Sequence, residues 1–424
     1  MNQTNNEKRI DVTSAAQLPE GYTIHRIQKA TDWTSHEDHA QDACQTHHGD
    51  STSHEAGTHY AGLRDLWCKV FGDEPGYVDH TYDSFGDDIE GYIITDESGQ
   101  TVSALTCYLC GTYCSTESTP TDPGSKPVYV SYAICTDPAS RGLGLAGKLT
   151  SIVRDIVTAP AETTFVFADG TETTGKNGLS IVSPAEPSLV DFYKGLSYTE
   201  HFYASVHATS VDDFGEDPDS DFGAGFLEPE LDSDVDVTYW GGDSDESTGD
   251  FYSKPKLEPI SASDYNAYRE RFLADVPHVA LSDAMAEFVQ TESHGGSGLY
   301  LINGGDAICM LQGIYKEGDY ESAAFAAELL VNPRLKEFSC EIDDEIAAGI
   351  AEHFGVGTIT YRAPDEGCYQ SGCPDDGAGP SADGYCQSMI SARADWTGSG
   401  SASNSSANIG FESAGLPYFG FPID

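Results

Sequence analysis

The chain has 424 residues, and 70 Asp and Glu against 21 Lys and Arg give a formal net charge of −49 at pH 7. A surface this acidic repels phosphate backbones and anionic headgroups, so we expect neither nucleic acid nor a membrane as a partner. The length predicts two or three compact domains, and 39% hydrophobic residues can fill their cores. The charge is equally consistent with a high-salt habitat and with plain solubility.

The N-terminal segment carries no export signal. Residues 1–20 are polar throughout, without the apolar run and cleavage site of a signal peptide, and no stretch reaches the apolar length that a bilayer requires. We therefore expect a cytoplasmic protein. The 11 cysteines are an odd number, which favours reduced thiols over a disulfide framework.

The first half of the chain predicts strands followed by alternating helices and strands. After a polar tail over 1–21, residues 22–29 predict a strand, and 35–59 form a His-rich loop without apolar periodicity. Helical spacing begins at Leu63, and a short helix is expected around 77–85. The later elements are strands at 91–95, 101–110 and 128–136, a helix from Leu145, a strand at 179–183, a helix at 187–196 and a closing strand at 198–208.

The second half predicts a similar order of elements. Residues 209–253 are dense in Asp and Glu and contain no Lys or Arg, which is typical of a linker. Residues 254–424 follow as a second lobe, so the domains are a tail (1–21), a first lobe (22–208), the linker and this second lobe. Its elements are helices at 262–272 and 282–290, strands at 298–303, 307–313 and 325–331, a helix at 342–354 and a strand at 357–362.

A glycine turn at 141–147 lies between a predicted strand and a predicted helix, where free backbone N–H groups and the helix dipole bind phosphate. Arg141 adds a charged fork for the same anion. Lys126, Lys148, Arg154, Lys176 and Lys194 extend this into a local basic patch.

Two other interpretations of the turn stay open. Gly142, Gly144 and Gly147 also match the dinucleotide pattern G-x-G-x-x-G, with Asp169 as the ribose-binding acid. A dinucleotide fold usually opens with its first strand at this turn, whereas four strand-like runs and two helices precede it here. A structural turn without a ligand is the other possibility.

Two motifs resemble the GNAT N-acetyltransferases. The family's cofactor loop has Arg or Gln, two residues, Gly, one residue, then Gly or Ala, and Arg141, Gly144 and Ala146 match it. The family's later motif is an aromatic residue, Tyr, two residues and Leu-Gly-Phe, and residues 192–198 read Phe-Tyr-Lys-Gly-Leu-Ser-Tyr. Ser197 and Tyr198 depart from that motif, as does Glu186 where the family often has Asn. Residues 63–73 and 183–187 also resemble a group of bacterial two-lobed acetyltransferases with a degenerate second lobe. The resemblance covers nearly the whole chain and is strongest over 128–198.

This resemblance implies an α/β (α+β) GNAT fold, with a mixed, mostly antiparallel central sheet flanked by helices in two lobes. It implies acetyl-CoA as co-substrate and direct transfer of the acetyl group to a primary amine of a small molecule or peptide, with polyamines, aminoglycosides or lysine side chains favoured by the acidic surface. The implied cofactor contacts are Ile134, Cys135, Thr136, Arg141, Gly142, Leu143, Gly144, Leu145, Ala146 and Glu186.

Two residues carry the implied catalytic roles. Tyr193 stands at the family position of the general acid that protonates the thiolate, with aromatic packing as its alternative. Asp424 is a candidate general base through the terminal carboxylate, with a simple chain end as its alternative. A CoA-binding protein without catalysis, or an NAD(P)-dependent oxidoreductase, would be the alternative functions. The oligomeric state is open.

No resident metal is expected. Cys107, Cys110 and Cys114 have a spacing that suggests zinc, but positions three apart on a strand point to opposite faces of the sheet. A looser group of Cys368, Cys373 and Cys386 and the histidines of residues 35–59 do not favour a specific site either.

Overall fold

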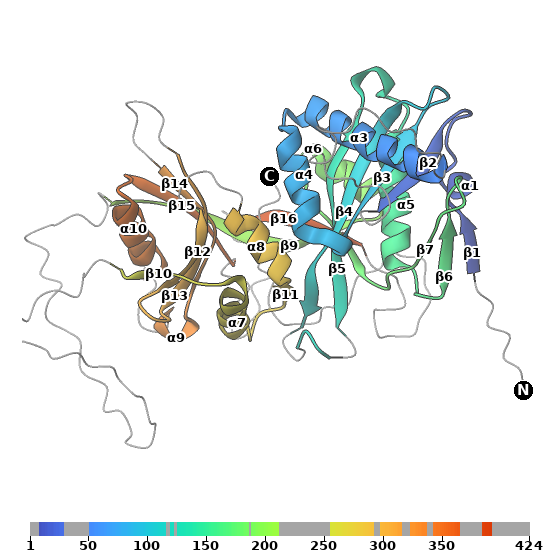
Figure 1. The fold of residues 1–424 in the computed structure, drawn as a ribbon. Helices are drawn as coiled ribbons and strands as arrows, with labels where there is room; N and C mark the ends of the chain where they lie inside the picture. Colours follow the sequence, from blue (N-terminus) through green and yellow to red (C-terminus); the bar gives the residue numbers. More distant parts are fainter. Residues whose placement is uncertain are drawn as a thin grey trace, which may run out of the picture.

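The computed structural model describes residues 8–28, 51–115, 119–122, 125–185, 188–211, 255–291, 297–315, 323–336, 342–364 and 384–391. Within this part of the chain, one sheet of 13 strands runs through both halves of the molecule, helices pack against it, and three further strands form a small second sheet (Figure 1). This is the mixed, mostly antiparallel α/β architecture that the sequence predicts. Among these residues, no helix is long and apolar enough to cross a membrane.

The first half of the large sheet is an antiparallel meander that ends on a parallel strand. β2, β3, β4 and β5 pair antiparallel in sequence order, and β8 then joins β5 in parallel. A parallel neighbour requires a crossover, and α5 lies within it. The bounds are β2 (Thr23–Gln28), β3 (Ile89–Thr95), β4 (Thr101–Cys114), β5 (Lys126–Thr136), α5 (Leu145–Thr158) and β8 (Leu179–Val182).

Helices cover both faces of this meander. On one face, the apolar stripe of α5 is buried as its spacing predicts, against Tyr92 and Leu105 of the sheet. On the other face lie α3 (Ser51–Phe71) and α4 (Pro75–Phe85), whose core includes Trp67 and Tyr82. Because alternate residues of a strand point to opposite faces, Ile93 and Ile94 belong to the two different cores.

Two predictions about the N-terminal region are wrong in part. The loop expected over 35–59 is helical from Ser51, because α3 begins there; its first turns have no apolar stripe, so hydrophobic periodicity does not detect them. The tail expected over 1–21 contains β1 (Lys8–Asp11) and α1 (Val12–Ala16), and the side chain of Val12 is fully buried. β1 forms the small sheet with β6 (Thr163–Val166) and β7 (Glu172–Thr174).

The second half of the large sheet repeats the pairing of the first. β10, β12, β13 and β14 are antiparallel neighbours, and β15 joins β14 in parallel. Two helices again precede the second strand of the meander, and the crossover again contains a long helix, here preceded by a short one. The bounds are β10 (Leu257–Pro259), α7 (Ala262–Phe272), β11 (His278–Leu281), α8 (Asp283–Thr291), β12 (Gly298–Ile302), β13 (Ala307–Tyr315), β14 (Ala323–Val331), α9 (Pro333–Lys336), α10 (Ile342–Phe354) and β15 (Thr358–Pro364). The repeat suspected from the order of elements is present in the topology.

The two lobes exchange their last strands. β9 (Thr199–Ser210), which follows α6 (Ser188–Gly195), pairs with β15 of the second lobe, and β16 (Gly384–Ser391) pairs with β8 of the first. β9 and β16 also pair with each other, so they join the halves of the sheet between the two lobes (Figure 1). The strand expected over 198–208 therefore does not close the first lobe. Apolar alternation cannot say which of two equivalent edges a strand joins.

The lobes also share a core. The ring centroid of Phe288 in α8 lies 5.3 Å from that of Phe85 in α4. The Phe288 ring also stacks on the His80 ring, with 5.8 Å between centroids. β11 of the second lobe pairs antiparallel with the end of β4, where a Cβ on Gly111 would lie 2.0 Å from the Ala280 carbonyl oxygen. The domain boundaries proposed from the sequence stay predictions, since residues 212–254 lie outside the described part of the chain.

Candidate active site

The predicted glycine turn follows β5 directly. Asp137 begins a 3-10 turn over Pro138–Ser140, and residues 141–144 lead into α5. Gly142 and Gly144 have φ values of +84° and +71°, a left-handed conformation that other residues rarely adopt. A Cβ at either position would meet no atom within 4 Å, so both glycines border open space. Residues 141–144 therefore form one exposed turn, and the other two predicted contacts, Leu145 and Ala146, begin α5, where the Leu145 side chain is buried.

The N-terminus of α5 is left without a cap. Gly144 is the N-cap residue and offers no side-chain acceptor, and the first turn contains no acidic residue. The first N–H groups of a helix have no intrahelical acceptor, and the helix dipole makes this end electropositive. The combination favours an anion at the start of α5.

Asp137 fixes the turn to its neighbours. Its carboxylate accepts hydrogen bonds from Lys69 Nζ at 2.6 Å and from the Ala139 backbone N–H at 2.9 Å, while its own N–H donates to the Val102 carbonyl at 2.8 Å. The hydrogen bond from Lys69 is the main reason that the pKa of Asp137 is lowered. The exposed Arg141 then lies at the start of the turn.

β5 and β8 separate beside this turn. Their parallel pairing covers Val128–Val130 of β5, yet β5 continues to Thr136. A β-bulge follows Tyr132, where the pairing with β4 shifts register and Ala133 has a φ of +49°. Bulges of this kind re-aim the backbone and are common beside active sites. Within the described ranges, no strand pairs with the β8-facing edge of β5 beyond Val130, so this edge could hydrogen-bond an extended ligand.

The three predicted residues at the end of β5 face different surroundings. Ile134 is half-buried and packs near Tyr193, and Thr136 shares a 3.1 Å hydrogen bond with Ser103. Cys135 is buried, and burial raises the pKa of its thiol to about 12. The thiol is therefore unreactive, and the Cys135 carbonyl accepts a hydrogen bond from the Ser103 hydroxyl at 2.8 Å on the β4 side.

Tyr193 of α6 completes the arrangement. Its side chain is 6% exposed and packs with Val182 at the end of β8 and with Ile134 of β5. Burial raises the pKa of Tyr193 to about 12, so the phenol stays protonated at neutral pH. The Phe192 ring lies 3.5 Å from the position of a Cβ on Gly147, so α6 packs against the first turn of α5. The glycine turn, the separated strands and Tyr193 therefore lie together.

The basic patch expected around the turn is not available as a whole. Lys176 Nζ lies 2.9 Å from the buried Glu90, and Arg154 pairs with Asp155 at 2.5 Å. Lys148 Nζ donates to the Gln17 carbonyl at 2.7 Å. These three side chains are already bonded to neighbouring groups. Arg141 is the exposed cation within the turn itself.

The equivalent place in the second lobe has the opposite electrostatics. The crossover helix α10 carries Asp343, Asp344 and Glu345 in its first turn, where α5 has no acid. Asp343 accepts from Lys336 Nζ at 2.5 Å, and Asp344 accepts from the Tyr361 hydroxyl at 2.8 Å. Carboxylates already satisfy this helix dipole and would repel a phosphate.

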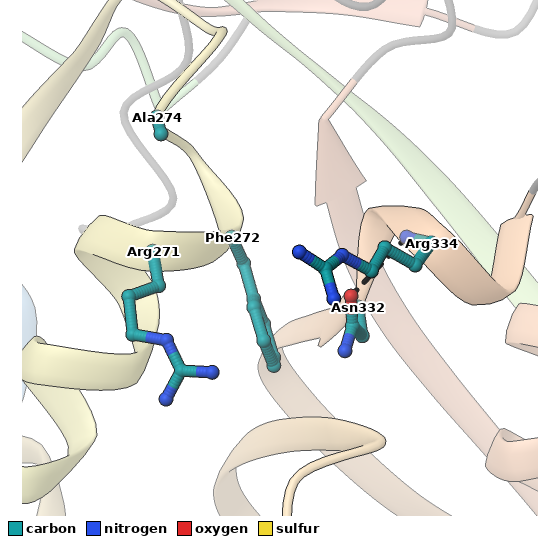
Figure 2. Close-up of a pocket in the computed structure, with 5 residues that line it drawn as sticks. All are labelled: Arg271, Phe272, Ala274, Asn332 and Arg334. Carbon is teal, nitrogen blue, oxygen red and sulfur yellow. Dashed lines mark hydrogen bonds between the residues drawn. The ribbon is translucent and has the colours of Figure 1, made fainter. Parts of the chain in front are cut away.

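A cavity of about 330 Å³ lies in the second lobe, where β14 leads into α9. Figure 2 shows the guanidinium groups of Arg271 and Arg334 on either side of the Phe272 ring, with Asn332 below. None of the predicted site residues lines this cavity.

Known proteins resemble the chain in structure only. No family model matches it, and no curated protein matches its sequence. A probable N-acyltransferase from Enterococcus faecalis V583 aligns with a TM-score of 0.50 at 9% identity, over 87% of this chain and 72% of its own. A GCN5-related N-acetyltransferase from Anabaena variabilis aligns with a TM-score of 0.48 at 12% identity, over 78% of this chain and 70% of its own. The chain has the GNAT fold. At these identities the likeness concerns the fold and not the reaction.

The sheet topology contradicts the dinucleotide alternative. In a dinucleotide-binding unit, the strand after the glycine-turn helix lies parallel in the same sheet. Here α5 leads to β6, which belongs to the small sheet, and β5 lies within an antiparallel meander. Asp169 instead accepts hydrogen bonds from the backbone and hydroxyl of Thr171 at 2.8 and 2.7 Å.

Two predicted site residues cannot be placed. Glu186 and Asp424 lie outside the described residues, so their roles stay predictions. The structure adds two features that the motifs did not indicate. Lys69 holds the turn through Asp137 from a helix distant in sequence, and the bulge at Ala133 follows no glycine or proline signal.

Proposed function

We propose that the chain is an acetyl-CoA-dependent N-acetyltransferase and that its first lobe holds the cofactor and performs the chemistry. The observation that carries the proposal is the meeting of an uncapped helix at a glycine turn, a pair of separated parallel strands and a protonated tyrosine. The acidic start of α10 supports a second lobe that binds no CoA.

The geometry supports a binding mode for acetyl-CoA. The pyrophosphate would lie on the first-turn amides of α5 beside the Arg141 guanidinium, which binds phosphate through a planar fork. The pantetheine arm is an extended amide chain, and the unpaired edge of β5 after Val130 offers it the hydrogen bonds of an added strand. Ile134 and Thr136 would contribute backbone groups to that edge, whereas the Cys135 carbonyl faces β4, where it accepts from the Ser103 hydroxyl.

The reaction is direct transfer. The amine attacks the thioester carbonyl, and the C–S bond breaks as the amide forms, so no covalent enzyme intermediate is needed. Positioning of the two reactants supplies much of the acceleration, and backbone N–H groups at the Ala133 bulge are suited to the developing oxyanion. Tyr193 would protonate the departing thiolate of CoA.

The acceptor is a primary amine on a small molecule or a peptide. The net charge of −49 attracts cationic compounds over several ångströms and favours polyamines, aminoglycosides or lysine side chains. The surface charge is too widely spread to choose among these three.

Acetyl transfer tests the proposal. The chain is incubated with isotope-labelled acetyl-CoA and a panel of polyamines, aminoglycosides and lysine peptides, and acetylated products are identified by mass spectrometry. We expect a product from at least one amine and about 100-fold slower turnover in Tyr193→Phe with acetyl-CoA affinity kept. Binding of acetyl-CoA without any product would support a CoA-binding protein without catalysis. Unchanged turnover in Tyr193→Phe would assign the tyrosine to packing.

A further inference from the structure

A cluster of metal-ligating side chains lies where the second lobe joins the first. Cys114 ends β4 of the first lobe, and His278 stands directly opposite it on β11 of the second. Glu270 approaches from α7. One ligand atom from each residue lies within 4.8 Å of the other two. None of the three takes part in the proposed acetyl transfer.

The hydrogen bonds of His278 leave a specific gap. Nδ1 lies 2.7 Å from the Val276 carbonyl oxygen, which can only accept, so Nδ1 must carry a proton. A neutral ring then presents the lone pair of Nε2 to Glu270 Oε2 at 3.1 Å, and two acceptors repel at that distance. Either a second proton or a metal cation between Nε2 and the carboxylate resolves this contact.

The thiol adds a third donor on the same side. Cys114 is 1% exposed, and its Sγ lies within 4.8 Å of a ligand atom of Glu270 and of one of His278. The nearest buried cation, Arg269, is engaged with Glu328 at 3.0 Å and with the Val279 carbonyl. The cluster therefore combines two potentially anionic ligands and one neutral ligand with no cation of its own.

We propose that Cys114, His278 and Glu270 bind a zinc ion that fastens the second lobe to the first. Thiolate, imidazole and carboxylate are all zinc ligands, and the bond from Nδ1 to a carbonyl is the usual support of a metal-bound histidine. The side chain of His278 is 5% exposed and that of Glu270 is 31% exposed, so water can reach the fourth position from the Glu270 side. Binding would convert the thiol to a thiolate and release its proton.

Of the three cysteines whose spacing suggests zinc, only Cys114 belongs to this cluster. Cys107 and Cys110 belong to the cores on opposite faces of the sheet, as alternation along β4 requires. Cys114 finds its partners instead on β11 and α7, more than 150 residues later in the chain. The three residues are too far apart in the sequence to form a recognisable metal-binding motif.

Cobalt substitution tests the site despite the acidic surface and the other histidines and cysteines. The full chain is freed of metal with a chelator and titrated with Co²⁺ in molar salt, which weakens nonspecific binding to carboxylates. We expect one equivalent to give a thiolate-to-cobalt charge-transfer band, Zn²⁺ to abolish it, and Zn²⁺ to raise the midpoint of thermal unfolding.

Variants assign the band to this cluster. Cys114→Ser and His278→Gln should lose it, and Cys107→Ser should keep it, because Cys107 is a buried thiol of the same strand outside the cluster. Circular dichroism checks that each variant folds. No charge-transfer band in the unaltered chain, or the same band in Cys114→Ser, would overturn the proposal.

X-ray absorption of the zinc-loaded, unaltered chain provides a measurement that does not depend on variants. One sulfur among four ligands agrees with the site, and none or several sulfurs contradicts it.

Discussion

Anion binding at the uncapped start of α5 can be tested by introducing an acidic residue there, as the equivalent helix α10 of the second lobe has. Ala146→Asp places a carboxylate in the first turn of α5, where α10 carries Asp343 and Asp344. The introduced charge would lie about 7 Å from a pyrophosphate on the first-turn amides. At an effective dielectric of about 20, two phosphate charges at that distance repel it by about 5 kcal/mol.

Screening reduces this figure. With a Debye length of about 8 Å at physiological salt, about 2 kcal/mol remains, which weakens acetyl-CoA binding about 30-fold. In 1 M salt the loss should shrink to about two-fold, because the Debye length falls to about 3 Å. The same carboxylate should leave the helix as stable or stabilise it by about 0.3–1 kcal/mol through the dipole.

Isothermal titration with acetyl-CoA at both salt concentrations measures the effect, and thermal unfolding checks the fold. Ala146→Asn is the matched control, because it has nearly the same shape without the charge and should bind close to the wild-type level. If Ala146→Asp bound acetyl-CoA as tightly as the unaltered chain, the anion would not lie at the start of α5.

Three further predictions concern the scaffold. Lys69→Met should weaken acetyl-CoA binding about two- to five-fold in titrations, because Asp137 loses the partner that holds the glycine turn, and an unchanged affinity would contradict that role. Glu90→Gln should cost about 3–5 kcal/mol in urea unfolding, since the partly buried Arg26 and Lys176 lose their counter-charge. Burial alone would raise the pKa of Glu90, but those cations lower it from 4.5 to about 2. The stability that the ionised carboxylate provides is therefore present above pH 4.5 and should be lost as the pH falls toward 2. An unfolding free energy that does not change with pH over this range would refute this. Gly111→Ala should cost about 1–3 kcal/mol in the same assay, because the added methyl meets the Ala280 carbonyl where the lobes join, and Gly76→Ala, with open space around it and no positive φ, serves as the comparison.

Local pattern predicted most elements of the fold. The spacing of Leu145, Leu149 and Ile152 predicted the buried stripe of α5, and the order of elements in the second half indicated the repeat. These features depend on neighbours within one element, which the sequence displays directly. The exchange of β9 and β16 depends on which of two equivalent edges each strand joins, and no residue encodes that choice locally.

The candidate site divides in the same way. The turn from Arg141 to Ala146 and the position of Tyr193 followed from short motifs, because each lies within one continuous segment. The sequence motifs did not indicate Lys69 or the partners of Cys114. Lys69 contacts Asp137, and Cys114 contacts its partners, only in the folded chain. The prediction of a basic patch was wrong in part for a related reason: Lys176 forms an ion pair with the buried Glu90, which is distant in sequence.

The most direct test of the central claim is isothermal titration of the unaltered full chain with acetyl-CoA, beside Arg141→Glu and Arg334→Glu. Arg334 follows β14 in the second lobe as Arg141 follows β5 in the first. We predict one acetyl-CoA per chain, lost in Arg141→Glu and kept in Arg334→Glu. Absence of binding to the unaltered chain, or binding that survives Arg141→Glu and disappears in Arg334→Glu, would contradict a cofactor site in the first lobe.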